Sequence, residues 1–401
     1  MEKKKKILLV NKFYYPRGGD CVYTLEMEKL LRKNGHEVAV FAMDHPDTLP
    51  TMYRQYFPEE VQFSSQNISS IFETVLRPFG TREVKKKFNR LLDDFHPDIV
   101  HLGNIHSQLS PVVAEIAYRR RIKVIWTLHD YKLLCPRYDC LRNGRIVCEE
   151  CLTNKFSVYR YTCMKNSRAA SFLAYLEAVK WDKEKIEKYV TRFICPSEFM
   201  KTMMQRGGFP GEKLTTMHHF LNSERIVEDE TGSPANYYCF IGRISTEKGV
   251  ETLLKAASQL PYNLKVIGSG PLLDQLSLKY QSGQIEFLGY KNWDEIKPIL
   301  KSARFLVSPS ECFEVLGLSN IEALCLGVPI LGANIGAIPE LINEQNGILF
   351  DTGNDIDLKD KIDFFFNEGK NRFDRKRISK ISKELFSAEN YYNRLLSIYN
   401  E

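Results

Sequence analysis

Short apolar runs alternate with longer stretches of helical periodicity along the whole chain. In the N-terminal half, buried strands are expected at residues 6–10, 36–42, 98–102, 124–128 and 192–195. In the C-terminal half, they are expected at residues 237–241, 264–267, 285–288, 305–307, 329–331 and 347–350. Short buried strands that alternate with helices are typical of parallel sheets in α/β proteins. The chain therefore carries two such series.

A polar stretch over residues 222–236, which contains Gly232 and Pro234, separates the two series. The pattern predicts an α/β protein with two facing, doubly wound Rossmann-like domains, over residues 1–225 and 236–385. Ligands of such sheets bind at the carboxyl ends of the strands. We therefore expect the functional site in a cleft between the two domains.

Two further stretches have helical spacing. Residues 171–189 mix apolar residues with lysines and glutamates, which favours a packed domain helix over a membrane helix. Residues 382–399 predict a helix near the end of the sequence.

Composition narrows the possible functions. Of the 401 residues, 43% are hydrophobic and 26% are charged, which is ordinary for a globular protein and excludes a disordered chain. The net charge of +6 is too small to indicate nucleic acid as a partner, but it suits anionic small molecules or an anionic membrane surface. The apolar run at residues 7–10 is too short for a signal peptide, and no run approaches a membrane span. We therefore expect a cytoplasmic protein.

Five of the ten cysteines lie within residues 135–163. Structural disulfides are rare in the cytoplasm, so clustered thiols there more often bind metal or carry out redox chemistry. Cys148 and Cys151 form a Cys-x-x-Cys pair of the kind found in metal sites. The alternative is a set of free or partly buried thiols.

The segment over residues 308–329 has the clearest pattern for chemistry. It leaves a strand, turns through a loop that carries Glu314, and enters a helix whose first turn carries Glu322. Backbone N–H groups near Leu318 and Ser319, at the N-terminus of that helix, favour a phosphate. The alternative is that Ser319 and Glu322 form only a capping box.

A second loop with candidate chemistry follows the first strand of the C-terminal half, at residues 242–249. Arg243 and Lys248 flank a turn at the carboxyl end of that strand. Two cations there suit a diphosphate, which arginine can bind with two parallel hydrogen bonds. The alternative is a pair of solvated surface charges.

Taken in order, these motifs resemble those of the retaining glycosyltransferases of family four, which have the two-domain GT-B fold. The resemblance covers essentially the whole chain. It rests on Gly18-Gly19, on residues 127–130, 196–199, 242–249, 268–271 and 287–289, and on the pair Glu314 and Glu322. It implies that residues 386–401 form a helix that crosses back to the N-terminal domain. One strand departs from the family pattern, because Gly103 replaces a histidine.

The resemblance assigns the donor diphosphate to Arg243 and Lys248, which would also neutralise charge on the leaving group. Gly18 and Gly19 would let the N-terminal backbone approach the phosphates, because glycine has no Cβ that would clash. The remaining diphosphate contacts would come from the backbone amides near Gly317, Leu318 and Ser319.

The resemblance also places the rest of the donor. Glu322 would bind the ribose hydroxyls, and Glu314 would contact the hydroxyls of the donor sugar and face the reacting carbon. His129 would lie beside the transferred sugar. The base would lie near Gly289 and Tyr290.

The implied mechanism retains the anomeric configuration and uses no metal ion. The departing diphosphate oxygen would take the proton of the acceptor on the same face, while Arg243 and Lys248 stabilise the leaving group. A covalent intermediate on Glu314 is the less favoured route. The Asp-x-Asp pair at Asp355 and Asp357 predicts a helix start rather than a catalytic metal site.

The implied activity is transfer of a sugar from a nucleotide-diphosphate sugar to a glycan or lipid-linked acceptor, in capsule, O-antigen or exopolysaccharide biosynthesis. The alternatives are a nucleotide-sugar 2-epimerase of the same fold, against which the glutamate pair argues, and a non-catalytic zinc-stabilised binding protein. Basic runs at residues 3–6, 85–90 and 119–121 suit peripheral association with the inner face of the cell membrane. Their alternative is solvated surface.

A branch of similar transferases has the same arrangement of cysteines, as an insertion at the carboxyl end of an N-domain strand. The resemblance implies a structural zinc ion held by Cys135, Cys148, Cys151 and Cys163, with Cys140 left over. Such a site would fix a loop that is otherwise too long and polar to hold one shape.

Overall fold

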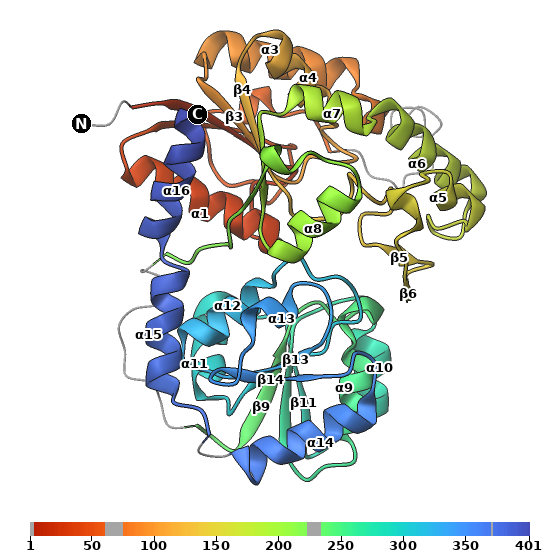
Figure 1. Ribbon diagram of the computed structural model, residues 1–401, viewed down its shortest axis with the longest axis vertical. Coiled ribbons are helices and arrows are strands. Elements are labelled where there is room, and N and C mark those ends of the chain that lie inside the picture. Colours follow the sequence, from red (N-terminus) through yellow and green to blue (C-terminus); the bar gives the residue numbers. More distant parts are fainter. Residues whose placement is uncertain (1–3, 61–74, 223–233, 370–371) are drawn as a thin grey trace. The chain divides into compact units, whose positions relative to one another are not determined.

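The computed structural model describes residues 4–60, 75–222, 234–369 and 372–401, and the chain forms two compact units (Figure 1). The first unit comprises Met1–Asn143, Cys148–His218 and Tyr391–Glu401, and the second comprises Gly144–Val147 and His219–Asn390. The boundary that we predicted at residue 225 lies outside the described residues, as does most of the polar stretch around it.

The first unit is built on a six-stranded sheet of order β2-β1-β3-β4-β7-β8, in which every neighbouring pair is parallel. Its strands are β1 (Lys6–Val10), β2 (Glu37–Phe41), β3 (Ile99–Leu102), β4 (Lys123–Thr127), β7 (Arg192–Cys195) and β8 (Leu214–Thr216). Its helices are α1 (Gly19–Lys33), α3 (Arg82–Phe95), α4 (Val112–Arg119), α5 (Ser157–Arg160), α6 (Arg168–Lys180), α7 (Lys183–Tyr189), α8 (Glu198–Arg206) and α16 (Ala388–Asn400). A two-residue pair, β5 (Leu141–Arg142) with β6 (Ile146–Val147), stands apart from the sheet.

The second unit repeats this plan with a parallel sheet of order β11-β10-β9-β12-β13-β14. Its strands are β9 (Tyr237–Ile241), β10 (Asn263–Ile267), β11 (Ile285–Gly289), β12 (Leu306–Ser308), β13 (Ile330–Ala333) and β14 (Gly347–Phe350). Its helices are α9 (Val250–Ala257), α10 (Leu273–Tyr280), α11 (Trp293–Ser302), α12 (Leu318–Cys325), α13 (Ile338–Leu341), α14 (Asp355–Phe366) and α15 (Arg375–Leu385). Tyr238, Phe305 and Leu331 are fully buried in its core.

The prediction of two α/β domains with parallel sheets is confirmed. Each strand expected from the apolar runs is present, with shifts of one or two residues at the ends. Sequence reasoning missed β8, because only Leu214 of its three residues is buried and two threonines follow it. Among the described helices α1 is the longest at 15 residues, and none of them has the length and apolar character needed to cross a bilayer.

Both long predicted helices were wrong as single elements. The stretch at 171–189 divides into α6 and α7, because Asp182 caps α7 by accepting a hydrogen bond from the Lys185 N–H at 3.0 Å. The stretch at 382–399 divides into α15 and α16. Phe386 and Ser387 leave the helix there to pair with Leu221, whose N–H donates to the Phe386 carbonyl at 3.0 Å.

Helix α16 packs into the first unit through tyrosine hydroxyls. The Tyr399 hydroxyl lies 2.6 Å from His101 Nδ1, and the Tyr392 hydroxyl lies 2.8 Å from His36 Nε2. The Tyr391 hydroxyl forms a hydrogen bond with the Tyr23 hydroxyl of α1. All these side chains are buried, so the hydrogen bonds select this position of α16 among other apolar packings.

Tyr399→Phe should lower the free energy of unfolding by about 1–3 kcal/mol, because it leaves His101 Nδ1 buried without that hydrogen bond. Urea unfolding measures the loss. Tyr118→Phe, at a half-exposed tyrosine, is the matched control and should change the free energy by less than about 0.5 kcal/mol. Equal losses in the two variants would contradict a stabilising role for the Tyr399–His101 contact.

Candidate functional site

Four loops at the carboxyl edge of the second sheet form one continuous shelf. The Ile244 N–H after β9 donates to the Ser269 carbonyl after β10 at 2.9 Å, and the Gly268 N–H donates to the Gly289 carbonyl at the end of β11 at 2.8 Å. The Glu311 N–H after β12 donates to the Glu247 carbonyl at 2.9 Å. The predicted donor residues of these loops are Arg243, Lys248, Gly289, Tyr290 and Glu314.

Lys248 and Glu314 meet on this shelf as a hydrogen-bonded ion pair. The Lys248 Nζ donates to Glu314 Oε1, and the Ser310 hydroxyl donates to the same oxygen at 2.5 Å. The Glu314 side chain is 13% exposed and that of Lys248 is 29% exposed. Sequence reasoning named both charges but missed their contact and the hydroxyl of Ser310, which lies four residues before Glu314 in the same loop.

Each partner keeps the other charged. Burial alone would raise the pKa of Glu314, but the Lys248 ammonium and the hydrogen bonds from Lys248 and Ser310 outweigh it and lower that pKa. Burial would lower the pKa of Lys248, but the Glu314 carboxylate outweighs it and raises that pKa. The pair is therefore ionised at neutral pH, and Lys248 offers a fixed positive charge.

Two glycines bring the backbone close enough for this contact. Gly249 has φ +62°, and a Cβ built there would lie 1.8 Å from the Pro309 carbonyl oxygen. Gly336, after β13, has φ +59°, and its Cβ would lie 2.6 Å from the Glu314 backbone nitrogen. Neither position tolerates a side chain without a shift of the backbone. The loops after β9, β12 and β13 are thus held against one another around Glu314.

Glu322 does not take part in a capping box at the start of helix α12. The helix begins at Leu318 with Gly317 as its N-cap, and no side chain caps it. The capping box proposed for Ser319 and Glu322 is therefore wrong, because Ser319 is already the second helical residue. Glu322 is the fifth residue, just past the first turn, and only 6% exposed.

The remaining donor-side residues lie on the surface of the same shelf. Arg243 is exposed directly after β9, and the Tyr290 side chain is 68% exposed after β11. Their positions leave both side chains accessible to a ligand at the carboxyl edge of the sheet.

In the first unit, His129 follows β4 at the carboxyl edge of its sheet. Its ring packs edge to face on Tyr23 of α1 at 4.8 Å between centroids, and α1 begins at Gly19 with Gly18 as its N-cap. Burial, together with the nearby His101, lowers the pKa of His129 to about 3. The imidazole is therefore neutral at physiological pH, so it can act through hydrogen bonds but not as a cation.

Two further histidines of this edge have structural contacts. His101 bonds Tyr399 through Nδ1 and Thr127 Oγ1 through Nε2 at 2.8 Å, and burial lowers its pKa to about 3. His106 stacks on Trp126 at 5.3 Å between ring centroids. Both histidines are therefore held by structural contacts within the first unit.

The cysteine-rich segment gathers several thiols around Cys135. Cys135, Cys140, Cys151 and Cys163 are buried, and Cys148 is half-buried. Hydrogen bonds from Cys140 and Cys151 lower the pKa of the Cys135 thiol. The structure therefore brings Cys140, predicted as the spare thiol, next to Cys135. In the ranges that the structure describes, no group of three or more His, Cys, Asp or Glu side chains is placed to hold a metal ion, so zinc stays a prediction.

Asp355 and Asp357 begin α14, as predicted. Asn354 caps that helix by accepting from the Ile356 and Asp357 N–H groups, both at 3.1 Å. Asp357 itself accepts from the Asp351 N–H at 2.8 Å. These local hydrogen bonds account for the acidic pair as a helix start.

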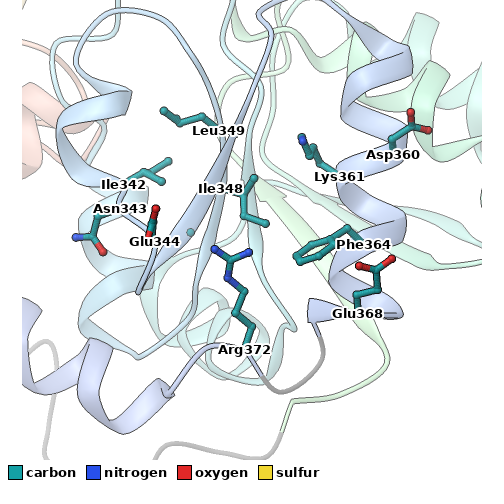
Figure 2. A pocket seen from close by; sticks show the side chains of 11 residues that line it. Ile342, Asn343, Glu344, Ile348, Leu349, Asp360, Lys361, Phe364, Glu368 and Arg372 are labelled. Carbon is teal, nitrogen blue, oxygen red and sulfur yellow. The ribbon is translucent and has the colours of Figure 1, made fainter.

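A cavity of about 630 Å³ lies elsewhere in the second unit, against the edge strand β14 (Figure 2). Figure 2 shows Arg372 extending toward Ile348 of β14, and its guanidinium lies 5.7 Å from the ring centroid of Phe364 in α14. The predicted donor residues do not line this cavity. Its volume therefore does not bear on the shelf around Glu314.

Comparisons with known proteins match most of the chain. Residues 17–225 match the family model described as Glycosyltransferase Family 4, and residues 224–384 match that of Glycosyl transferases group 1. An uncharacterized glycosyltransferase of Methanocaldococcus jannaschii is 28% identical over 53% of this chain and 62% of its own length. An uncharacterized protein of the Klebsiella pneumoniae cps region is 27% identical over 86% of this chain and 89% of its own.

The structure is also similar to that of Anabaena HepE in complex with UDP-glucose. The TM-score is 0.68 at 17% identity, and the match covers 98% of each chain. At this identity the likeness concerns the fold, and it confirms the GT-B prediction.

Lys248→Met should lower the free energy of unfolding by about 2–3 kcal/mol, because it leaves the Glu314 carboxylate buried without its cation. Chemical denaturation at neutral pH measures this loss. Combining it with Glu314→Gln should recover part of the loss. A double variant as unstable as the sum of the two singles would show that the charges do not interact.

The contribution of Glu314 should also depend on pH. Its pKa is lower in the folded protein than its ordinary value of 4.5, so its stabilisation is complete above pH 4.5 and is lost as the pH falls through the folded value. The stability difference between the wild type and Glu314→Gln should therefore shrink below pH 4.5. A difference that stays constant in acid would contradict the pairing.

Proposed function

Because the chain belongs to glycosyltransferase family 4, we propose that it transfers a sugar from a nucleotide-diphosphate sugar to a glycan or lipid-linked acceptor, with retention of configuration. The observation that carries the proposal is the ionised pair of Lys248 and Glu314, fixed by close backbone contacts at the carboxyl edge of the second sheet. The UDP-glucose bound by the structurally similar HepE supports a nucleotide-sugar donor.

The donor binds along the shelf in this proposal. Arg243 and Lys248 hold the diphosphate, because an exposed guanidinium and a permanently charged ammonium flank the same loop. Lysine has three N–H donors, so Lys248 can contact a phosphate oxygen and Glu314 together. Glu322 binds the ribose hydroxyls, and the base lies at Tyr290. The N–H groups of Gly317, Leu318 and Ser319 contribute the partial positive charge of the α12 N-terminus.

The chemical step breaks the bond between the anomeric carbon and the diphosphate oxygen. The acceptor oxygen bonds to that carbon on the same face, and its proton passes to the departing diphosphate oxygen. Arg243 and Lys248 stabilise the negative charge that develops on the leaving group, so transfer needs no metal ion. Glu314 orients the sugar hydroxyls, and His129 contributes as a neutral imidazole that hydrogen-bonds the sugar.

We place the protein in bacterial surface polysaccharide assembly, in the cytoplasm at the inner face of the cell membrane. The Klebsiella relative from a cps region supports the pathway class. An acceptor linked to a lipid would be presented at that membrane face, and a net charge of +6 favours association with anionic lipids.

A structural zinc ion in the cysteine-rich segment is part of the proposal. Four thiols of the segment are buried, and those of Cys140 and Cys151 lie within hydrogen-bonding distance of Cys135, which supports it because structural zinc is bound by clustered cysteines. The ion would supply no chemistry to transfer; it would fix the loop over residues 135–163. The proximity of Cys140 to Cys135 makes Cys140 an alternative ligand to Cys148.

The activity is tested with a screen of UDP-, GDP- and ADP-sugars. Nucleoside diphosphate release should appear with one donor class, should rise with extracts that contain lipid-linked glycans, and should persist in EDTA. NMR of the product should show the anomeric configuration of the donor. Release from none of these donors, or isomerisation of the sugar without an acceptor, would overturn the transferase assignment.

Glu314→Gln and Lys248→Ala should each lower kcat by about 100-fold or more, because each removes a charge next to the reacting centre. The control is Lys279→Ala, which removes an exposed lysine paired with Glu251 at 3.0 Å in the same unit. It should leave kcat within about twofold of the wild type. Equal activity of Lys248→Ala and Lys279→Ala would remove Lys248 from the mechanism.

Protein purified without chelators should contain one zinc ion per chain, measured by elemental analysis. Cys135→Ser should abolish the zinc content, whereas Cys325→Ser, a buried cysteine of the second unit, should preserve it. Substoichiometric zinc in the wild-type protein would reject the site.

A further inference from the structure

Helix α6 of the first unit buries small and polar side chains and exposes large apolar ones. Its buried face carries Ser171, Ala174 and Glu177, which are at most 6% exposed. Its opposite face carries Phe172, Leu176 and Val179, which are 45%, 39% and 47% exposed. The three are spaced by four and three residues, so they form one line along the helix, which we call the outer stripe. A surface helix normally buries its apolar face, so an exposed apolar line indicates a partner.

The orientation of α6 is fixed by its polar inner face. Glu177 forms an ion pair with Lys132 at 2.8 Å, and both side chains are less than 10% exposed. The Ser171 hydroxyl accepts a hydrogen bond from the Met164 N–H at 3.0 Å. Rotating the helix to bury the outer stripe would break both contacts and leave a buried charge without its partner. The outer stripe is therefore held outward.

The apolar surface continues beyond the outer stripe at both ends. Phe172 packs edge to face on Tyr159 at 5.7 Å, next to Phe156, which is 42% exposed. At the other end, Trp181 donates through its indole N–H to the Pro78 carbonyl at 2.8 Å. Pro78 belongs to a short 3-10 helix, Arg77–Phe79, and the exposed Val75 and Leu76 directly precede it. The exposed Phe156 at one end and the exposed Val75 and Leu76 at the other thus extend the apolar surface that a bilayer interface could bury.

Cations flank the outer stripe. Lys165 and Arg168 are exposed at the start of α6, and Lys183 is exposed just after its end. Burial lowers the pKa of Lys180, and the positive charges of Lys85 and Lys185 lower it further against the opposing charge of Glu115, so several cations lie near this end. An anionic surface would relieve that repulsion.

The basic runs of α3 and α4 suit a membrane less well than this face. Arg119 pairs with Glu115 within α4 at 2.6 Å, and Lys87 pairs with Glu83 within α3 at 3.2 Å. Arg120, beyond the end of α4, pairs with Asp93. These ion pairs already neutralise part of the positive charge of α3 and α4. In addition, the described residues of these two helices form no exposed apolar stripe like that of α6.

We propose that the outer stripe of α6 inserts into the interfacial region of an anionic lipid bilayer, with the flanking lysines and Arg168 on lipid phosphates. The inference rests on the proposed function, because a lipid-linked acceptor explains why a transferase would dock on a membrane. It names the surface that would do so: one α-helix lying in the interface plane, with no segment across the bilayer.

The test is cosedimentation of the full chain with vesicles of phosphatidylglycerol mixed with phosphatidylcholine, and with vesicles of phosphatidylcholine alone. The wild type should bind the anionic vesicles, and salt should weaken that binding. Phe172→Ser/Leu176→Ser/Val179→Ser should lower the vesicle partition coefficient by at least about tenfold, because it removes the inserting groups without changing charge. Leu278→Ser/Ile356→Ser is the matched control at exposed apolar residues of the second unit, and it should bind like the wild type.

Three results would overturn the proposal. The first is unchanged vesicle binding by the triple variant. The second is a fall in its melting temperature, which would indicate that the outer stripe is covered within the protein. The third is a wild-type dimer that the triple variant loses in sedimentation. Nucleoside diphosphate release with a soluble acceptor should be equal in all variants. If the wild type releases no nucleoside diphosphate, the proposed transferase activity is wrong. The role of α6 is decided separately, by the vesicle binding alone.

Discussion

The close contact between the Gly249 backbone and the Pro309 carbonyl is the constraint on which the donor-side residues depend. It joins the loop after β9 to the loop after β12, two strands that are neighbours in the sheet. Only with these loops in contact can Lys248 reach Glu314, which is 66 residues away in sequence. The charge of both residues depends on this contact. Burial alone would favour their neutral forms, and the charge of the partner outweighs burial in each pKa. The ion pair of the site therefore depends on a glycine at position 249, where a side chain would keep the two loops apart.

Much of this arrangement could be predicted from the sequence, because parallel strands place their carboxyl ends at one edge. That rule is enough to group Arg243, Lys248 and Glu314 from their positions after apolar runs. It does not give the ion pair, which depends on how far two loops approach each other. The sequence also could not show where the helix that carries Glu322 begins, so the capping box at Ser319 was wrong. The sequence fits a capping box, but the helix already begins at Leu318, so Ser319 cannot be the cap.

Long-range partners explain the other differences. Residues 382–399 have unbroken helical periodicity, yet the helix is interrupted where Phe386 and Ser387 pair with Leu221. Residue periodicity reports one face of one helix, and it contains no information about a segment more than 160 residues earlier that competes for the same backbone groups. The sequence also did not show which face of α6 is buried, because its mixed composition fits a packed helix with either face inward.

The tyrosines of α16 impose an order on the assembly of the chain. His101 and His36 belong to the first part of the sequence, but their hydroxyl partners are Tyr399 and Tyr392. During translation the first unit emerges from the ribosome long before these partners exist, whereas the sheet of the second unit is complete once β14 has emerged. The sheet of the second unit can therefore form before the first unit is complete, although it is made later. Until α16 has emerged, the imidazoles of His101 and His36 lack these hydroxyl partners, so the native hydrogen bonds of the first unit can be completed only after α16 is made.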